Sequence, residues 1–131
     1  MAHGVIYRPR ELAGFVAEQD GQRVGLVTYQ VSGDASEIVT LDSSRPGIGV
    51  GTALIEAVKE AARAAGCRRL WQVTTNDNLD ALRIYQQRGF VLVAVHRNAV
   101  EAARRLKPEI PRVGAHGIPL RDEIELELLL D

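Results

Sequence analysis

The sequence lacks several features that would point to particular classes of protein. Its 131 residues include one cysteine, Cys67, so an internal disulfide framework is impossible and a reducing compartment such as the cytoplasm is expected. The formal net charge is −1, without the basic excess typical of a general nucleic-acid binder. No apolar run is long enough to cross a bilayer, and the first ten residues lack the apolar region of a signal peptide. We therefore expect a cytoplasmic protein that binds neither nucleic acid nor membrane.

The composition is otherwise ordinary for a globular protein. Hydrophobic residues make up 46% of the chain and charged residues 25%, and the length suits one core of ordinary size. We expect a single domain over residues 1–131. Cys67 is expected to be a small buried apolar residue where a strand begins.

Hydrophobic periodicity predicts a chain of alternating strands and helices. Strands are expected at residues 12–17, 24–31, 37–42, 69–74, 90–95 and 123–130. Helices are expected at residues 51–65 and 78–88 and from Asn98, which with Glu101 resembles a capping box, to a point before Pro108. Asp20-Gly21 is expected to form a hairpin turn, and Gly89 with Phe90 to end the second helix in a Schellman-type contact. The fold class is α/β, a mixed sheet with one parallel crossover.

A glycine-rich turn lies between the third strand and the first helix. Gly47, Gly49 and Gly51 place main-chain N–H groups at a helix N-terminus, where the helix dipole favours anions. No lysine follows Gly51, so the turn is not a P-loop. The glycine spacing is also wrong for a dinucleotide fingerprint, and Val73-Thr-Thr75 stands where that fold needs an acid. Taken alone, the turn leaves two interpretations open: a phosphate-binding site, and a tight strand-to-helix turn that binds no ligand.

A second motif lies on the following helix. Asn78 and Tyr85 are seven residues apart, about two helical turns, so both can face one side of the helix. Asn78 could be a helix cap, but Asn76 and Asp77 also offer capping groups, which favours a functional role for Asn78. Tyr85 could also be an amphipathic core residue.

Together and in this order, the two motifs resemble the GNAT superfamily of acetyl-CoA-dependent N-acetyltransferases. The resemblance runs from Glu37 to about Phe90 and includes Gly49-Val-Gly51-Thr-Ala-Leu54 and Asn78-x-x-Ala81-x-x-Ile-Tyr85-x-x-x-Gly89-Phe90. It implies a single acyl-CoA N-acyltransferase-like domain that uses acetyl-CoA as co-substrate and a small-molecule or peptide amine as acceptor.

The resemblance also assigns residues to the cofactor. Leu41 and Ser43 would pair through their main chains with the pantetheine arm and the acetyl carbonyl, and N–H groups around Ser43 would polarise that carbonyl. Asn78 would contact the cofactor arm. The diphosphate would be held by Arg45 and by the main chain of Gly47, Ile48, Gly49, Val50, Gly51 and Thr52.

The implied reaction is direct attack of an amine on a thioester. Glu37 would act as the base that keeps the amine neutral, although it could equally be a solvent-facing strand residue. Tyr85 would protonate the departing thiolate. His96 and His116 have no partners at metal-ligand spacing, so no metal is expected.

Two departures from the family pattern bear on function. Pro46, which has no N–H, stands where the family has Gln or Arg, and Arg45 before it is the alternative phosphate ligand. Too few residues precede Leu12 for the family's N-terminal helix pair, so we expect that pair to be missing. A non-catalytic acyl-CoA-binding or regulatory module and a structural subunit are therefore alternatives. The uncovered sheet predicts a homodimer.

The acceptor itself is not readable from the sequence. The long loop of residues 107–122 is a candidate, since such loops often serve function. Glu109, Asp122 and Glu123 could attract a cationic amine there, although a proline-stiffened connection without a ligand role is an equal alternative. Glu123, Glu125 and Glu127 are expected on a wet sheet face or under a partner chain.

Overall fold

The structure is a computed structural model that describes residues 13–44 and 49–131. The strands are β1 (Ala13–Gln19), β2 (Gln22–Ser32), β3 (Ala35–Ser43), β4 (Arg69–Thr75), β5 (Val91–His96) and β6 (Glu123–Leu129). The helices are α1 (Val50–Ala64), α2 (Leu79–Gln87), α3 (Ala99–Leu106) and the 3₁₀ turn η1 (Ala115–Gly117). Every predicted strand and helix is present, with ends shifted by one or two residues.

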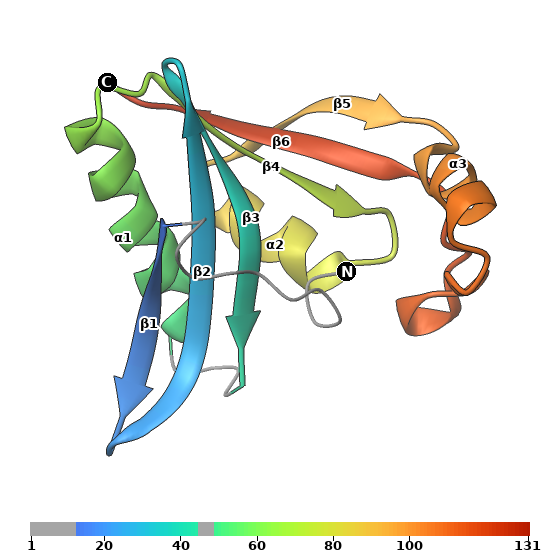
Figure 1. The fold of residues 1–131 in the computed structure, drawn as a ribbon, viewed down its shortest axis with the longest axis horizontal. Helices are drawn as coiled ribbons and strands as arrows, with labels where there is room; N and C mark the ends of the chain where they lie inside the picture. Colours follow the sequence, from blue (N-terminus) through green and yellow to red (C-terminus); the bar gives the residue numbers. More distant parts are fainter. Residues whose placement is uncertain (1–12, 45–48) are drawn as a thin grey trace. The chain divides into compact units, whose positions relative to one another are not determined.

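The strands follow the order β1-β2-β3-β4-β6-β5 in a six-stranded sheet (Figure 1). Among the described residues β3 and β4 form the parallel pair, with Ala35 opposite Arg69 and Glu37 opposite Trp71. Helix α1 connects these two strands, as expected of a parallel crossover. The α/β class with a mixed sheet is thus confirmed. The absent N-terminal helix pair concerns residues 1–12, which lie outside the described residues.

The chain forms two compact units, and the expectation of a single domain stays a prediction. The first unit comprises the described residues up to Trp71 together with Leu129–Asp131, and the second comprises Gln72–Leu128.

In the first unit, β1, β2 and β3 form an antiparallel meander. Asp20 (φ 53°) and Gly21 (φ 77°) both take left-handed conformations, which the two-residue hairpin turn requires, so the predicted turn is confirmed. Helix α1 packs on these strands through a stripe of buried side chains: Val50, Leu54, Ile55, Val58 and Ala62.

Gly25 of β2 lies directly under the first turns of α1. A Cβ atom at this position would lie 2.5 Å from Val50 Cγ1 and 3.0 Å from Leu54 Cδ1. The absence of a side chain therefore allows the helix to approach the strand closely.

In the second unit, α2 ends as the sequence predicts. Gly89 has φ 98°, and the Phe90 N–H donates to Tyr85 O at 3.0 Å, which satisfies one of the last carbonyls of the helix. Strands β5 and β6 pair antiparallel, with Leu92 opposite Leu126. Leu126 is fully buried, and a Cβ atom at Gly89 would lie 3.5 Å from Leu128 Cδ1.

The start of α3 differs from the predicted capping box. Asn98 takes the left-handed conformation (φ 61°) and its side chain makes no capping hydrogen bond. Its main-chain N–H donates to Asp122 Oδ1 at 2.8 Å, and the Glu101 carboxylate pairs with Arg104. The capping box does not form because Asp122, distant in sequence, takes the Asn98 N–H, and Arg104, one turn further along α3, takes the Glu101 carboxylate.

Candidate active site

The described half of the glycine turn leaves the start of α1 without a side-chain cap. Gly49, the residue before α1, is left-handed (φ 79°) and has no side chain with which to cap the helix, and the first turn of α1 has no acidic residue. The first main-chain hydrogen bond of the helix joins the Ala53 N–H to Gly49 O at 3.0 Å. The amides of residues 50–52 precede it, so they have no carbonyl partner within the helix. Arg45, Pro46, Gly47 and Ile48 lie outside the described residues.

The end of β3 leads into this turn. Leu41 pairs with Val27 of β2, and Ser43 pairs with Gly25. The next amide, that of Ser44, donates to Val24 O at 2.9 Å and is therefore engaged. Of the N–H groups near Ser43 that were expected to polarise an acetyl carbonyl, the one at residue 44 is not available.

A shallow hollow of about 180 Å³ lies beside this strand end. Its lining includes Arg23, Asp42 and Ser44. Sequence reasoning missed Arg23 because it lies on another strand and in no motif. Its guanidinium is a cation beside the end of the strand that enters the glycine turn.

Glu37 lies in β3, between Gln30 of β2 and Trp71 of β4. It is half-buried, and its side chain takes part in an interaction. This position is compatible with both roles considered from the sequence, a general base and a solvent-facing strand residue.

Asn78 is the N-cap of α2. Its Oδ1 atom accepts the Ala81 N–H at 3.1 Å. The expectation that Asn76 or Asp77 could cap α2 in place of Asn78 is wrong, because the side chains of both residues bind other partners. Asn76 Nδ2 donates to Pro119 O, and Asp77 Oδ2 accepts the Ala115 N–H. Capping uses the carboxamide oxygen of Asn78, so its Nδ2 donor is not part of the cap.

Tyr85 is the residue of this site with the most unusual surroundings. Its side chain is fully buried, and its ring meets Phe90 edge-on at 5.0 Å between centroids. Within the described part of the chain its hydroxyl has no hydrogen-bond partner. Burial raises the pKa of this phenol well above its ordinary value, so the group keeps its proton. A buried tyrosine normally finds a partner for its hydroxyl, so an unpaired one marks a candidate binding atom.

Directly before Asn78, residues of the β4–α2 connection hold the long loop in place. Asn76 Oδ1 accepts the N–H groups of Arg121 and Asp122 at 3.1 and 2.9 Å. Gly114 packs so closely on Asp77 that a Cβ atom would lie 2.1 Å from its Oδ2. The loop is thereby attached to the start of α2.

Arg104 holds the same loop from inside. It is only 7% exposed, and its guanidinium donates to Ile110 O, Pro111 O and Leu120 O at 3.1, 2.7 and 2.8 Å. Sequence reasoning missed this residue. The available signal was its place four residues after Val100, on the buried face of α3.

Asp122, which was expected to attract a cationic amine, is not at the surface. It is buried, and its carboxylate accepts hydrogen bonds from the Asn98 N–H and the Arg121 side chain. These donors hold the pKa of Asp122 below its ordinary value. The idea that it recruits a cation is therefore wrong, because its charge is already neutralised.

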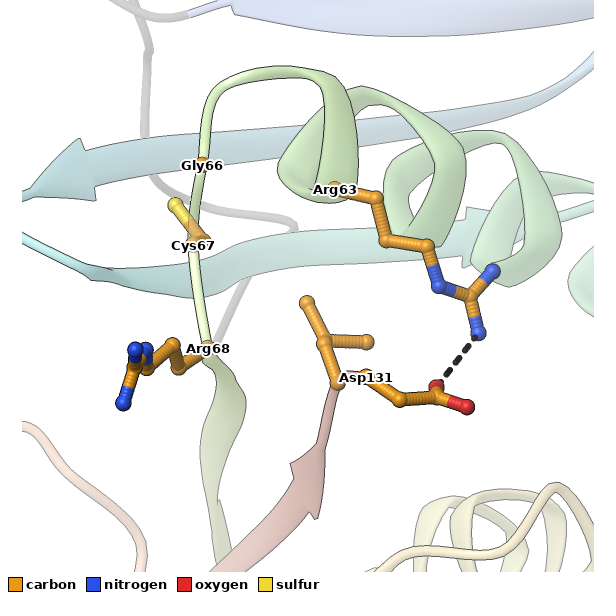
Figure 2. Close-up of a pocket in the computed structure, with 6 residues that line it drawn as sticks. Arg63, Gly66, Cys67, Arg68 and Asp131 are labelled. Atoms are coloured by element: carbon orange, nitrogen blue, oxygen red, sulfur yellow. Dashed lines mark ion pairs between the residues drawn. The ribbon is translucent and has the colours of Figure 1, made fainter.

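A larger cavity of about 420 Å³ lies elsewhere, near Cys67 (Figure 2). The side chains of Arg63 and Asp131 point toward each other, with Arg63 Nη2 3.7 Å from Asp131 Oδ1, and the Arg68 side chain points away. Cys67 is buried just before β4, as predicted. None of the predicted site residues lines this cavity.

The described residues contain neither a cluster of metal ligands nor a membrane-spanning helix. Across residues 13–44 and 49–131, no three His, Cys, Asp or Glu side chains gather as metal ligands would. In the same residues no helix is long and apolar enough to span a membrane.

Comparison with known proteins identifies the family. Residues 3–90 match the Acetyltransferase (GNAT) family. The uncharacterized protein YdhI of Bacillus subtilis is 48% identical over 127 residues, which is 96% of this chain and 79% of that protein.

Two solved structures share the fold. An IAA acetyltransferase from Bacillus cereus superposes with a TM-score of 0.80 at 24% identity over 92% of this chain and 79% of its own. A GNAT family acetyltransferase from Elizabethkingia anophelis with acetyl-CoA bound gives 0.80 at 19% identity, over 92% and 78%. The chain therefore belongs to the GNAT family and is an N-acetyltransferase.

Proposed function

We propose that the protein transfers the acetyl group of acetyl-CoA to a primary amine by direct attack. The amine nitrogen forms a bond to the acetyl carbon and the carbon–sulfur bond breaks. The amine loses a proton to a base, and the departing thiolate gains one from an acid. The bound acetyl-CoA of the E. anophelis protein supports acetyl-CoA as co-substrate here.

The observation that carries this proposal is the buried, unpaired hydroxyl of Tyr85. A phenol with a raised pKa is protonated at neutral pH and can donate to a thiolate formed beside it. A tyrosine that served only the core would be expected to have a partner for its hydroxyl. We therefore assign Tyr85 as the general acid.

Glu37 is proposed as the base, acting directly or through water. A free alkylamine has a pKa near 10.4, so a carboxylate that accepts its proton increases the reactive fraction. The half-buried position of Glu37 in β3 suits this role.

The cofactor residues follow from the same family assignment. In the first unit, the main chains of Leu41 and Ser43 would pair with the pantetheine arm, and Arg45 and residues 47–52 would hold the diphosphate. The left-handed Gly49 and the uncapped first turn of α1 support the second assignment. In the second unit, the Nδ2 group of Asn78 would donate to the arm while Oδ1 caps α2.

The test is release of free thiol from acetyl-CoA with a panel of amines, comparing wild type with Tyr85→Phe. Tyr29→Phe, on β2, is the matched control. We expect kcat to fall about 10²-fold in Tyr85→Phe and to be unchanged in Tyr29→Phe. Equal rates in the two variants would remove Tyr85 from the mechanism. Tight acetyl-CoA binding by calorimetry without turnover of any amine would favour the non-catalytic module instead.

We also infer that the protein is a homodimer. Strand β5 is terminal in the strand order, and four of its large apolar side chains are exposed: Val91, Leu92, Val93 and Val95. An edge strand with this composition readily pairs with another chain. Light scattering that gives the mass of one chain at working concentration would contradict the inference.

A further inference from the structure

The segment from Arg97 to Asp122, here called the basic platform, differs in charge from the rest of the chain. It comprises α3 and the hairpin that follows it. The formal net charge of the whole protein is −1. The platform alone holds six cationic residues against three acidic ones, Glu101, Glu109 and Asp122. The cationic residues are Arg97, Arg104, Arg105, Lys107, Arg112 and Arg121.

Two of the three carboxylates are neutralised within the platform. Glu101 pairs with Arg104, and Asp122 is buried against the Arg121 side chain and the Asn98 N–H. Glu109 is the carboxylate that remains exposed at the platform surface. The platform therefore presents almost no negative charge to a molecule that approaches it.

Three of the cations, in contrast, are exposed and have no acidic partner. Arg105, Lys107 and Arg112 all lie at the surface. No ion pair joins any of them to a carboxylate of residues 13–44 or 49–131. Since no carboxylate of the described residues neutralises these three cations, they are available to bind an anion from solution.

The platform is rigid, which distinguishes it from a loop with scattered charges. The Leu120 N–H donates to Arg112 O at 2.9 Å, and the Gly114 N–H donates to Ile118 O at 2.8 Å, which closes a short hairpin. The guanidinium of Arg104 fixes the base of this hairpin through three carbonyls. Arg112 is thus attached to a backbone that does not need to be ordered when a ligand binds.

The platform also lies beside the proposed reaction site within the same unit. Asn76 and Asp77 bind it at Pro119, Arg121 and Ala115. These two residues directly precede Asn78, the proposed contact to the cofactor arm, and α2 then leads to Tyr85. The part of the platform around Ala115, Pro119 and Arg121 is therefore attached next to the start of this helix.

We propose that the amine acceptor carries a negatively charged group, a carboxylate or a phosphate, and that the platform binds it through Arg105, Lys107 and Arg112. This inference rests on the proposed acetyl transfer and specifies the acceptor class for it. It replaces the expectation that Asp122 recruits a cationic amine, because that carboxylate is already paired.

The test compares acceptors that differ only in the anion, using thiol release from acetyl-CoA. The pairs are β-alanine with β-alaninamide, which tests the carboxylate, and phosphoethanolamine with ethanolamine, which tests the phosphate. We expect the anionic member of at least one pair to have a kcat/KM about tenfold higher or more. The advantage should shrink at high salt, since exposed charges are screened.

The variant is the triple substitution Arg105→Gln, Lys107→Gln and Arg112→Gln, and Lys59→Gln in the other unit is the control. The triple variant should raise KM for the anionic acceptor about tenfold or more. KM for acetyl-CoA and for the neutral acceptor should stay within about twofold in both proteins. Calorimetry with N-acetyl-β-alanine and its amide measures the same preference without turnover.

The outcomes separate the two proposals. Equal kcat/KM within both pairs, or a preference that survives in the triple variant, would overturn the anionic acceptor and leave acetyl transfer standing. A raised KM for acetyl-CoA in the triple variant would assign the platform to the cofactor phosphates instead. If no amine increases thiol release above the rate measured without amine, the proposed transfer is contradicted and this inference with it.

Discussion

Replacing Arg104 by methionine should loosen the basic platform while the rest of the chain stays folded. The guanidinium donates to three main-chain carbonyls and pairs with Glu101. Hydrogen bonds to a charged group contribute about 1.5–3 kcal/mol each, but carbonyls in a loop regain water when it opens. A carbonyl that stays out of water without its donor costs about 1–3 kcal/mol, so for three carbonyls we expect a loss of about 3–5 kcal/mol in the free energy of opening the hairpin. Methionine keeps the apolar stem, so the packing of α3 is largely preserved.

Hydrogen exchange measures this loss at individual amides. The N–H groups of Gly114 and Leu120 close the hairpin, and a loss of 3–5 kcal/mol would speed their exchange by about 10²- to 10³-fold or more. The control is Arg105→Met, which removes the same charge from the exposed neighbour. It should change exchange by less than about threefold. If the two variants exchange alike, Arg104 does not hold the loop and the rigidity of the platform needs another cause.

Tyr85→Phe should lower activity without lowering stability, because it removes a buried hydroxyl that has no partner among the described residues. The midpoint of urea unfolding should be unchanged or higher. A large fall in the midpoint would mean that the hydroxyl has a structural partner. Gly114→Ala should reduce the free energy of unfolding by about 1–3 kcal/mol, since its Cβ would overlap Asp77; a neutral effect in urea unfolding would contradict that packing. Asn78→Ala should cost about 1 kcal/mol and raise KM for acetyl-CoA, whereas Asn78→Ser should restore the cap but not KM; recovery of both would limit Asn78 to capping. The pKa of Asp122 is lowered in the folded state, so the stability it contributes is complete above its ordinary pKa of 3.8 and is lost as pH falls through the lowered value. Asp122→Asn should therefore destabilise the protein at pH 7 and not at the lowest pH. An equal effect at both would refute the charged pair.

The features that the sequence predicted correctly are those that neighbouring residues determine. The Asp20-Gly21 turn and the helix stop at Gly89 depend on conformations that few residue types adopt, so the residue type itself is the signal. The periodic apolar residues of α1 likewise predict which face is buried. The glycine turn and the Asn78–Tyr85 pair were sufficient to indicate the family.

The features that it missed depend on partners distant in sequence. Glu101 does not close a capping box on Asn98 because Asp122, 24 residues away, takes the Asn98 N–H. Asn76 does not cap α2 because its Oδ1 atom accepts two main-chain N–H groups more than 40 residues further along the chain. Arg104 is buried because a loop folds over it and supplies three carbonyl acceptors, and no helical pattern predicts that loop. The surface that we propose binds the acceptor depends on these contacts, so the sequence shows its charged residues but not which of them are paired.

Gly25 has a consequence that extends beyond packing. Because it sets how near the first turn of α1 can come to β2, a residue outside both recognisable motifs determines the height of that turn above the strands. Gly25→Val would push the start of the helix outward and misplace every amide that follows Gly49. The geometry of the proposed phosphate-binding turn is therefore determined partly by β2, and grafting the glycine turn alone onto another scaffold would not transfer it.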